Sequence, residues 1–298
     1  MRLALAQLSS TPDRAENLAK VLTAMERARQ GGADAIVFPE VVLDRFFPAL
    51  PGDTSDRRSA ARKLAEPIPG PTSETIAAQA RQLSLVTVFN LYEIADDGRT
   101  FDSSPVFDAD GSLLGVTRMI HITDYEGFHE KDYYAPGDQG GDPSVPVYDT
   151  RAGRIGVAIC YDRHFPEYMR ALALAGAELV VIPQAGTVGE WPDGLYEAEV
   201  RTAAFQNGYF AALANRVGAE DTLTFSGESF AVSADGAVLA RGAAGAEDLV
   251  LVEMDLASRH RSAGRRLFWG DRRPELYRRW FGGTDRAAAA TADPEADR

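Results

Sequence analysis

Short apolar runs recur along the chain, and most are continuous rather than alternating with polar residues. Runs of Val, Ile, Leu and Ala of this kind are typical of strands that are covered on both faces. The pattern predicts buried strands at Leu3–Leu8, Ala35–Phe38, Leu85–Phe89, Ile155–Ile159, Leu179–Ile182, Phe210–Ala214 and Leu249–Met254.

Amphipathic stretches with a helical repeat lie between these runs. Their spacing predicts helices at Arg14–Arg29, Ser73–Leu83, Pro166–Leu174 and Leu195–Gln206. The tripeptides Ala109-Asp110-Gly111 and Ala234-Asp235-Gly236 each separate two apolar runs, which predicts hairpin turns. Strands that alternate with helices indicate an α/β fold.

One segment of the chain occurs twice in a similar form. Gly32–Glu40 and Gly176–Gln184 each contain a glycine turn, a buried strand, a proline and a polar residue. Two similar α/β halves that face each other would produce this repeat, with helices outside and two sheets within. Any unit of helix, glycine and strand has the same general form, so the repeat alone leaves a duplication open.

The composition is that of a globular protein with a large core. Of the 298 residues, 45% are hydrophobic, and no break in composition divides residues 1–280, which predicts a single domain. Residues 281–298 lack the periodicity of a packed element, so we expect them to form a disordered C-terminal tail.

Charge and cysteine content narrow the class of protein. The net charge of −13 argues against a nucleic-acid partner, which normally requires a basic face. No apolar run reaches the length of a signal peptide or of a membrane span, so we expect no membrane partner. The single cysteine cannot form an internal disulfide. Together these features predict a cytoplasmic location.

Two reactive side chains follow predicted strands. Glu40 comes shortly after one strand and Cys160 directly after another, and active sites of open α/β sheets lie beyond the carboxyl ends of strands. A cysteine can attack a carbonyl or C=N carbon once a base takes its proton, and a buried glutamate can be that base. Spacing alone does not separate these roles from an inert core cysteine and a solvated or helix-capping glutamate.

Longer strings of residues carry more information than these two positions. Gly156–Glu167, which reads GVAICYDRHFPE, closely resembles the nucleophile segment of nitrilase-superfamily amidases. Val37–Glu40 is similar to that family's general-base segment, and Phe128–Asp138 resembles the loop with its second glutamate. Further similar strings follow in the family's order at Ala214–Gly218, Ser226–Phe230 and Asp271–Tyr277. The resemblance runs from about Arg2 to Trp280, nearly the whole chain.

Resemblance to these carbon–nitrogen hydrolases implies a four-layer α-β-β-α sandwich. It implies Glu40 as the general base, Cys160 as the nucleophile and Glu130 as a support for the reacting groups, with no metal and no organic cofactor. The backbone amide of Tyr161 would donate to an oxyanion, because it follows the nucleophile on a sharp turn. The family also implies a homodimer or larger homo-oligomer that acts on a small-molecule substrate.

Met119 lies where the family carries its catalytic lysine. The family segment runs Arg-Lys-x-His-Ile, whereas this chain has Arg118–Ile122, which reads RMIHI. The lysine stabilises the negative oxygen that forms when a thiolate attacks an amide, and removing one such donor commonly costs on the order of 10²–10³ in rate. The lysines of this chain are Lys20, Lys63 and Lys131. We expect none of them to take the place of the catalytic lysine. Lys20 and Lys63 lie in polar stretches and should face solvent, and Lys131 should point to the side opposite its neighbour Glu130 in an extended segment.

Three interpretations of this departure stay open. The first is a hydrolase with an amidine-like substrate, since attack on an amidinium carbon gives a neutral intermediate that needs no cation. The second is an ordinary amidase assisted by His121 or Arg118. The third is a catalytically impaired relative that binds a ligand or a partner. If an amine rather than water resolves the thioester, the enzyme is a synthase or an acyltransferase.

Several side chains are candidates for contact with the substrate. They are Tyr125, Tyr161, Trp191, His121 and His164. Packing in the core is an equally good interpretation of the aromatic ones. The four histidines show no metal-ligand spacing with the cysteine. Asp271–Tyr277 and the Cys160 segment most resemble the N-carbamoyl-amine and ureido-acid amidase branches, which implies a small amide or N-carbamoyl substrate.

Overall fold

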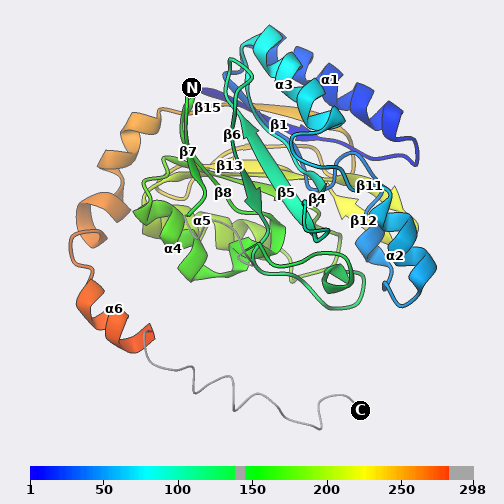
Figure 1. Ribbon diagram of the computed structural model, residues 1–298. Helices are drawn as coiled ribbons and strands as arrows, with labels where there is room; N and C mark the ends of the chain where they lie inside the picture. Colours follow the sequence, from blue (N-terminus) through cyan, green and yellow to red (C-terminus); the bar gives the residue numbers. More distant parts are fainter. Residues whose placement is uncertain (138–144, 282–298) are drawn as a thin grey trace.

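The computed structural model describes residues 1–137 and 145–281. Within them, two β-sheets lie face to face between two pairs of helices (Figure 1). Helix α6 (Pro274–Phe281) ends the described chain. The tail predicted at 281–298 therefore lies outside the described residues except for Phe281, which is helical.

The first sheet has parallel strands at its centre and antiparallel strands at both sides. The parallel strands are β1, β2 and β3. Its order is β15 (Asp248–Glu253), β1 (Arg2–Gln7), β2 (Ala35–Val37), β3 (Val86–Val88), β5 (Thr100–Phe107) and β4 (Leu91–Ile94), with β6 (Leu113–Arg118) paired to β5.

The second sheet has the same plan. Its parallel strands are β8, β9 and β10. Its order is β14 (Val238–Arg241), β13 (Phe230–Val232), β10 (Phe210–Asn215), β9 (Leu179–Gln184), β8 (Gly153–Val157) and β7 (Val147–Thr150). A separate ribbon joins β11 (Val217–Glu220) to β12 (Leu223–Ser226).

Helices cover the outer face of each sheet. Helices α1 (Arg14–Gln30) and α3 (Pro71–Leu83) pack on the first sheet, and α4 (Pro166–Leu174) and α5 (Leu195–Asn207) pack on the second (Figure 1). The remaining helical elements are α2 (Ser55–Arg62) and the short η1 (Phe47–Ala49), η2 (Glu130–Asp132), η3 (Cys160–His164), η4 (Leu256–Arg261) and η5 (Gly264–Phe268).

The apolar residues form three layers that match this arrangement. The central cluster contains Leu5, Val37, Val157 and Val181, which come from both sheets. A second cluster joins α1 and α3 to the first sheet, and a third joins α4 and α5 to the second. Strands with apolar side chains on both faces are needed to build such a stack. The four-layer α-β-β-α sandwich expected from the sequence is confirmed.

The predicted elements agree with the structure to within a few residues. Helix α4 has the predicted bounds, because Pro166 fits its first turn and Phe165 before it is extended. Both predicted hairpin turns are present, between β5 and β6 and between β13 and β14. Helices α2 and α6 and strands β4, β5, β6, β7, β11, β12, β13 and β14 were not predicted as elements.

The two repeated segments lie in corresponding places in the two sheets. Gly32–Glu40 contains β2, and Gly176–Gln184 contains β9. Their last residues meet across the central layer, since the amide of Glu40 donates to the carbonyl of Gln184 at 3.4 Å. The repeat therefore brings the ends of two facing strands to one place. Among the described residues, no helix is long and apolar enough to cross a membrane.

Candidate active site

The turn after β2 holds Glu40 rigidly in the space between the two sheets. Val41, the next residue, has a φ of +46°, a conformation that is costly for a β-branched residue. The amide of Val41 donates to Asn90 Oδ1 at 2.6 Å. Arg216 Nη1 donates to the carbonyls of Glu40 and Val41 at 2.9 and 2.5 Å. These contacts fix a turn that directs the carboxyl of Glu40 inward, where it is fully buried.

Arg216 is a structural residue that the sequence alone does not reveal. It lies just after β10 and is 1% exposed, and its guanidinium also pairs with Glu220 at 2.5 Å. Arginine suits this place because its planar group can serve several acceptors at once. The second sheet thus supports the general-base segment of the first.

Cys160 occupies a strained position at the start of η3. It follows β8 closely and has a φ of +43°, which few residues other than glycine adopt. Such strain is often kept at functional sites, where it presents one side chain. Cys160 is 4% exposed, and Gln184 Nε2 lies 3.2 Å from its Sγ. The amide of Tyr161 lies in the first turn of η3, where amides lack intrahelical partners.

Arg163 links the cysteine to its surroundings. Its Nη1 donates to the carbonyl of Cys160 and to Gln184 Oε1, both at 2.9 Å. Its Nε lies 3.4 Å from Glu199, and its guanidinium stacks over the ring of Tyr196. Arg163 therefore orients Gln184, whose amide then points to the sulfur.

Glu130 and Met119 are the other two predicted site residues that are buried in the structure. Glu130 lies in η2, is fully buried and accepts from the amide of Thr123 at 3.3 Å. Met119 is also fully buried, and its amide donates to the carbonyl of Asp102 at 2.9 Å. Its side chain belongs to the same apolar cluster as Cys160. Where the family pattern expects a lysine, this site therefore has a buried thioether.

The acidic groups of the site influence one another strongly. Burial raises the pKa of Glu40, and the nearby charges of Asp102 and Glu130 raise it further. Burial raises the pKa of the Cys160 thiol as well, and the charges of Glu40 and Glu130 add to this, while Arg163 opposes it. The thiol is therefore neutral at rest and needs a base during attack.

The cations that the sequence offered as substitutes lie elsewhere. Arg118 Nε donates to Glu93 at 2.8 Å, and its guanidinium covers Phe101. Lys131 is 62% exposed and lies 3.8 Å from Asp124. Both cations are paired with carboxylates, Arg118 with Glu93 and Lys131 with Asp124, and a part for either of them in the reaction stays a prediction.

The side chain of His121 contacts residues in and next to η3. Its Nδ1 lies 2.7 Å from Asp162, and its ring stacks on Phe165 with centroids 3.5 Å apart. Asp162 also accepts from the backbone amide of His121 at 3.0 Å. The contacts of His121 join the Met119 segment to η3, and the donation considered from the sequence stays a prediction.

Four of the side chains predicted to contact substrate form a closed ring of aromatic contacts. The centroid distances are 6.4 Å for Tyr125–Tyr161, 5.2 Å for Tyr161–His164, 5.2 Å for His164–Trp191 and 5.9 Å for Trp191–Tyr125. Glu190 adjoins this aromatic ring and accepts from Tyr125 at 2.6 Å and from Tyr196. The charge of Glu190 adds to the raised pKa of Cys160, and Tyr161 of the aromatic ring directly follows Cys160 in the chain.

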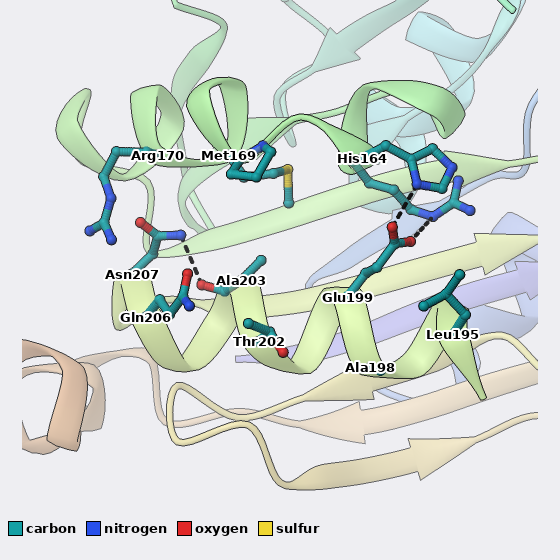
Figure 2. Close-up of a pocket in the computed structure, with 12 residues that line it drawn as sticks. His164, Met169, Arg170, Leu195, Ala198, Glu199, Thr202, Ala203, Gln206 and Asn207 are labelled. Carbon is teal, nitrogen blue, oxygen red and sulfur yellow. Dashed lines mark hydrogen bonds and ion pairs between the residues drawn. The ribbon is translucent and has the colours of Figure 1, made fainter. Parts of the chain in front are cut away.

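A cavity of about 360 Å³ lies between α4 and α5 (Figure 2). His164 and Glu199 line it, and His164 Nδ1 lies 2.6 Å from Glu199. Arg163 also lines it, but Glu40, Glu130 and Cys160 do not. The cavity therefore lies behind η3, on the helical side of the second sheet.

Metal chemistry was not expected from the sequence. In residues 1–137 and 145–281, no group of three or more His, Cys, Asp or Glu side chains is arranged to hold a metal ion. Sequence reasoning missed five polar residues near Glu40 and Cys160: Asn90, Asp102, Gln184, Glu190 and Arg216. A signal was present for Gln184, because it corresponds to Glu40 in the repeated segment.

Comparison with known proteins identifies the family. The sequence profile described as carbon-nitrogen hydrolase matches residues 2–262. The chain belongs to the carbon–nitrogen hydrolase family. It is 32% identical to a citrullinase of Francisella tularensis over 93% of this chain and 96% of the relative. It is also 32% identical to an N-carbamoylputrescine amidase of Solanum lycopersicum, with 91% of this chain and 92% of the relative covered.

Solved structures of carbon–nitrogen hydrolases have the same fold. A carbon-nitrogen hydrolase from Helicobacter pylori G27 matches with a TM-score of 0.80 at 26% identity, covering 94% of this chain and 98% of that one. An amidase from Nesterenkonia sp. AN1, solved with acrylamide added to its active-site cysteine, matches with a TM-score of 0.74 at 26% identity. It covers 94% of this chain and 99% of that one. The protein is a carbon–nitrogen hydrolase of the nitrilase superfamily.

Glu130 makes stability depend on pH. Burial raises its pKa from 4.5 to about 8, so the folded protein holds a proton that the unfolded chain has lost over that interval. The contribution of this group is complete below pH 4.5 and declines as the pH rises to 8, by up to ~1.4 kcal/mol per pH unit. We expect Glu130→Gln to flatten the fall in unfolding free energy over this range, as measured by urea titration. An unchanged slope would contradict the assignment.

Proposed function

We propose that Cys160 attacks the carbon of a small C–N substrate, that Glu40 takes the thiol proton, and that Glu130 helps to hold the reacting groups. Strain at Cys160 and the burial of both carboxyls support these roles. The sequence contains one cysteine, so a cysteine nucleophile in this chain is Cys160. The bond from sulfur to carbon forms as the thiol proton moves to Glu40, and the leaving nitrogen then takes that proton.

Hydrolysis completes the cycle with the same groups. Water attacks the covalent intermediate and gives a proton to Glu40, and the sulfur leaves and recovers its proton. The side-chain amide of Gln184 lies 3.2 Å from the sulfur, and the backbone amide of Tyr161 follows Cys160 in η3. Both can donate a hydrogen bond to an oxyanion, but unlike the family's lysine neither brings a positive charge to it.

We propose an amidine-like or guanidino substrate, and the observation that carries this proposal is Met119. The thioether is buried in the same apolar cluster as Cys160, and Arg118 and Lys131, the cations considered from the sequence, pair with Glu93 and Asp124. Among the described residues, the buried carboxyls of Glu40, Asp102 and Glu130 form no ion pair with an Arg or Lys side chain, and burial raises the pKa of each. A positively charged reacting group would favour their ionised forms. Attack on an amidinium carbon gives a neutral intermediate, for which a lysine is not needed.

The aromatic group next to the sulfur supports a second positive group on the substrate. Tyr125, Tyr161 and Trp191 offer ring faces, and Glu190 offers a carboxylate beside them. Aromatic faces attract ammonium and guanidinium groups, by ~2 kcal/mol or more when the groups are desolvated. The relatives are named for citrulline and N-carbamoylputrescine, so the guanidino counterparts of these compounds are the substrates to test.

A pair of matched substrates tests the proposal. We expect kcat/KM to be at least about tenfold higher for the guanidino counterpart of N-carbamoylputrescine than for the ureido compound itself, and likewise for arginine against citrulline. The release of ammonia measures the turnover of the substrates in both pairs. Met119→Lys is the matched variant. It should lower the ratio of kcat/KM for the guanidino compound to kcat/KM for the ureido compound by about 10–100-fold, because it places a cation near the charged carbon.

Other outcomes of this substrate comparison would indicate a different reaction. If the ureido compounds or simple amides are preferred, the amidine-like substrate is wrong, and an amidase that works through Gln184 and the Tyr161 amide remains. If hydroxylamine, but not water, releases the covalent group from Cys160, an amine acceptor and a transferase are indicated. If neither substrate loss nor an adduct occurs, the protein is an impaired relative that binds ligand.

A further inference from the structure

Asp102 is a buried carboxyl that the reaction described above does not use. It lies in β5, is fully buried and faces Glu40 within hydrogen-bonding reach. Its Oδ1 accepts from Asn90 Nδ2 at 2.6 Å. In the part of the chain that the structure describes, its Oδ2 has no hydrogen-bond donor, and the Cys160 thiol is the one donor that acts on the carboxyl of Glu40.

Two facing carboxyls can bond to each other only if one of them carries a proton. Ionised carboxylates accept hydrogen bonds but do not donate them. Two negative charges held together in a dry site would also repel each other. Burial raises the pKa of Asp102 to about 6 and raises that of Glu40 as well. The contact therefore keeps a proton at neutral pH, and the two groups titrate as a pair.

We propose that Glu40 and Asp102 form one acid–base unit that holds a single proton at rest and two protons once it has deprotonated Cys160. The proposal rests on the role proposed above for Glu40. Asp102 touches Glu40 and not the substrate, so it is a positioning residue that acts through its neighbour. The shared proton keeps a negative charge on the pair in a site that has Met119 in place of a cation.

The protons of the cycle balance with this unit. The thiol gives its proton to the pair as the S–C bond forms, and the pair then holds two. One proton goes to the leaving nitrogen as the C–N bond breaks, so the pair returns to one. Attacking water restores the second proton, and the departing sulfur takes it back. No other base, oxidant or metal enters these steps.

The surroundings of Asp102 tie it to the residue that departs from the family pattern. Its backbone carbonyl accepts from the amide of Met119 at 2.9 Å. Asn90, which donates to its side chain, also accepts from the amide of Val41 next to Glu40. Asp102 thus lies between the turn of the general base and the position of the missing cation.

The variants Asp102→Asn and Asp102→Ala separate proton sharing from a structural role. Asparagine keeps an oxygen for Asn90 and an amide donor for Glu40, but an amide is a weaker donor to a carboxylate than a carboxyl is. We expect the acid limb of the kcat/KM profile to move to higher pH by about one unit in Asp102→Asn, and further in Asp102→Ala. At the optimum, Asp102→Asn should keep kcat/KM within about tenfold, whereas Asp102→Ala should lose on the order of 10².

Asp44→Asn is the matched control. Asp44 is a buried carboxyl whose pKa burial also raises to about 6, but it pairs with Arg14 at 3.0 Å, away from Cys160. Its removal should leave the acid limb in place. If Asp102 only supports the fold, Asp102→Asn keeps every contact and its profile coincides with that of the wild type, which would overturn the proposal.

Isotope-edited infrared spectroscopy tests the shared proton without any activity. Protein labelled with ¹³C at the Asp or the Glu carboxyls is measured one pH unit above each variant's acid limb, or at pH 7.5 if no substrate is turned over. Glu130 is replaced by glutamine in all three proteins, because its pKa of about 8 would give a band of its own. In this background we expect a protonated-carboxyl band in the otherwise wild-type protein and in Asp44→Asn that is absent from Asp102→Asn. A band equal in all three proteins would overturn the proposal even if Cys160 and Glu40 act as proposed. A band without turnover would retain the shared proton and reject the proposed function.

Discussion

Replacing Cys160 with alanine is expected to lower kcat/KM by on the order of 10⁵-fold or more and to abolish the covalent intermediate. The reason is that the other groups close to Cys160 cannot replace a nucleophilic sulfur: Gln184 and the Tyr161 amide are donors, and Arg163 is committed to backbone and side-chain oxygens. Glu40 would then have no thiol to deprotonate.

The measurement is the intact mass of the protein after incubation with pooled ureas, amides, amidines and guanidines. Wild type should gain the mass of an acyl or amidine group, and Cys160→Ala should gain none, with equal thermal unfolding showing that the variant is folded. The chain has one cysteine, so any thiol adduct is located without further mapping. Turnover that survives in the alanine variant would reject the nucleophile.

Simple alkylation is a weaker test of the same residue. A thiolate of low pKa is normally recognised by its rapid alkylation at neutral pH. Burial and two nearby carboxyls raise the pKa of Cys160, so slow alkylation is compatible with an active nucleophile. Activation here depends on a substrate that brings Glu40 and the thiol into reaction.

The layers of the fold could be predicted because their signal is local. Continuous apolar runs such as Leu179–Ile182 and helical repeats such as Pro166–Leu174 report burial residue by residue. The edge strands are harder to predict. Strand β14 reads Val-Leu-Ala-Arg and is largely exposed, and β7 is only half-buried, so neither has the apolar pattern of a core strand.

Buried polar residues explain most of what was missed at the site. Asp102, Ser103 and Ser104 are consecutive and look like part of a surface loop, yet all three are buried inside β5. Their partners Asn90 and Glu93 are separated from them by ten residues or more, so no local pattern reveals the pairing. The resemblance to a family named Glu40, Glu130 and Cys160 as site residues. It did not name the buried polar residues that surround them in this chain.

Arg216 and Glu190 show the same limit at longer range. Arg216 contacts a turn 176 residues earlier in the chain, and a charged residue of this kind is normally expected at the surface. Glu190 can be identified as part of the site only from its contacts, because it accepts hydrogen bonds from Tyr125 and Tyr196 in other segments of the chain. The sequence named Tyr125 as a candidate for substrate contact, and only the fold shows that it donates to this carboxylate.

Replacing Glu40 with glutamine is expected to lower kcat/KM by ~10³–10⁴-fold, because an amide cannot take the proton of the thiol. Glutamine has almost the same shape, and the turn is held through backbone atoms by Arg216 and Asn90, so the fold should be retained. Residual activity should increase with pH, since Cys160 must then lose its proton to solvent, and its pKa is raised.

Glu93→Gln provides the matched control for this variant, and the comparison decides between a base and a general need for buried charge. Glu93 is 4% exposed in the same sheet but pairs with Arg118, away from the sulfur. Steady-state kinetics from pH 5 to 10 should show a loss of less than about tenfold for Glu93→Gln and an unchanged pH optimum. A similar loss in both variants would mean that the sheet requires its acidic groups for packing. A loss confined to Glu40→Gln, and relieved at high pH, identifies the group that accepts the thiol proton.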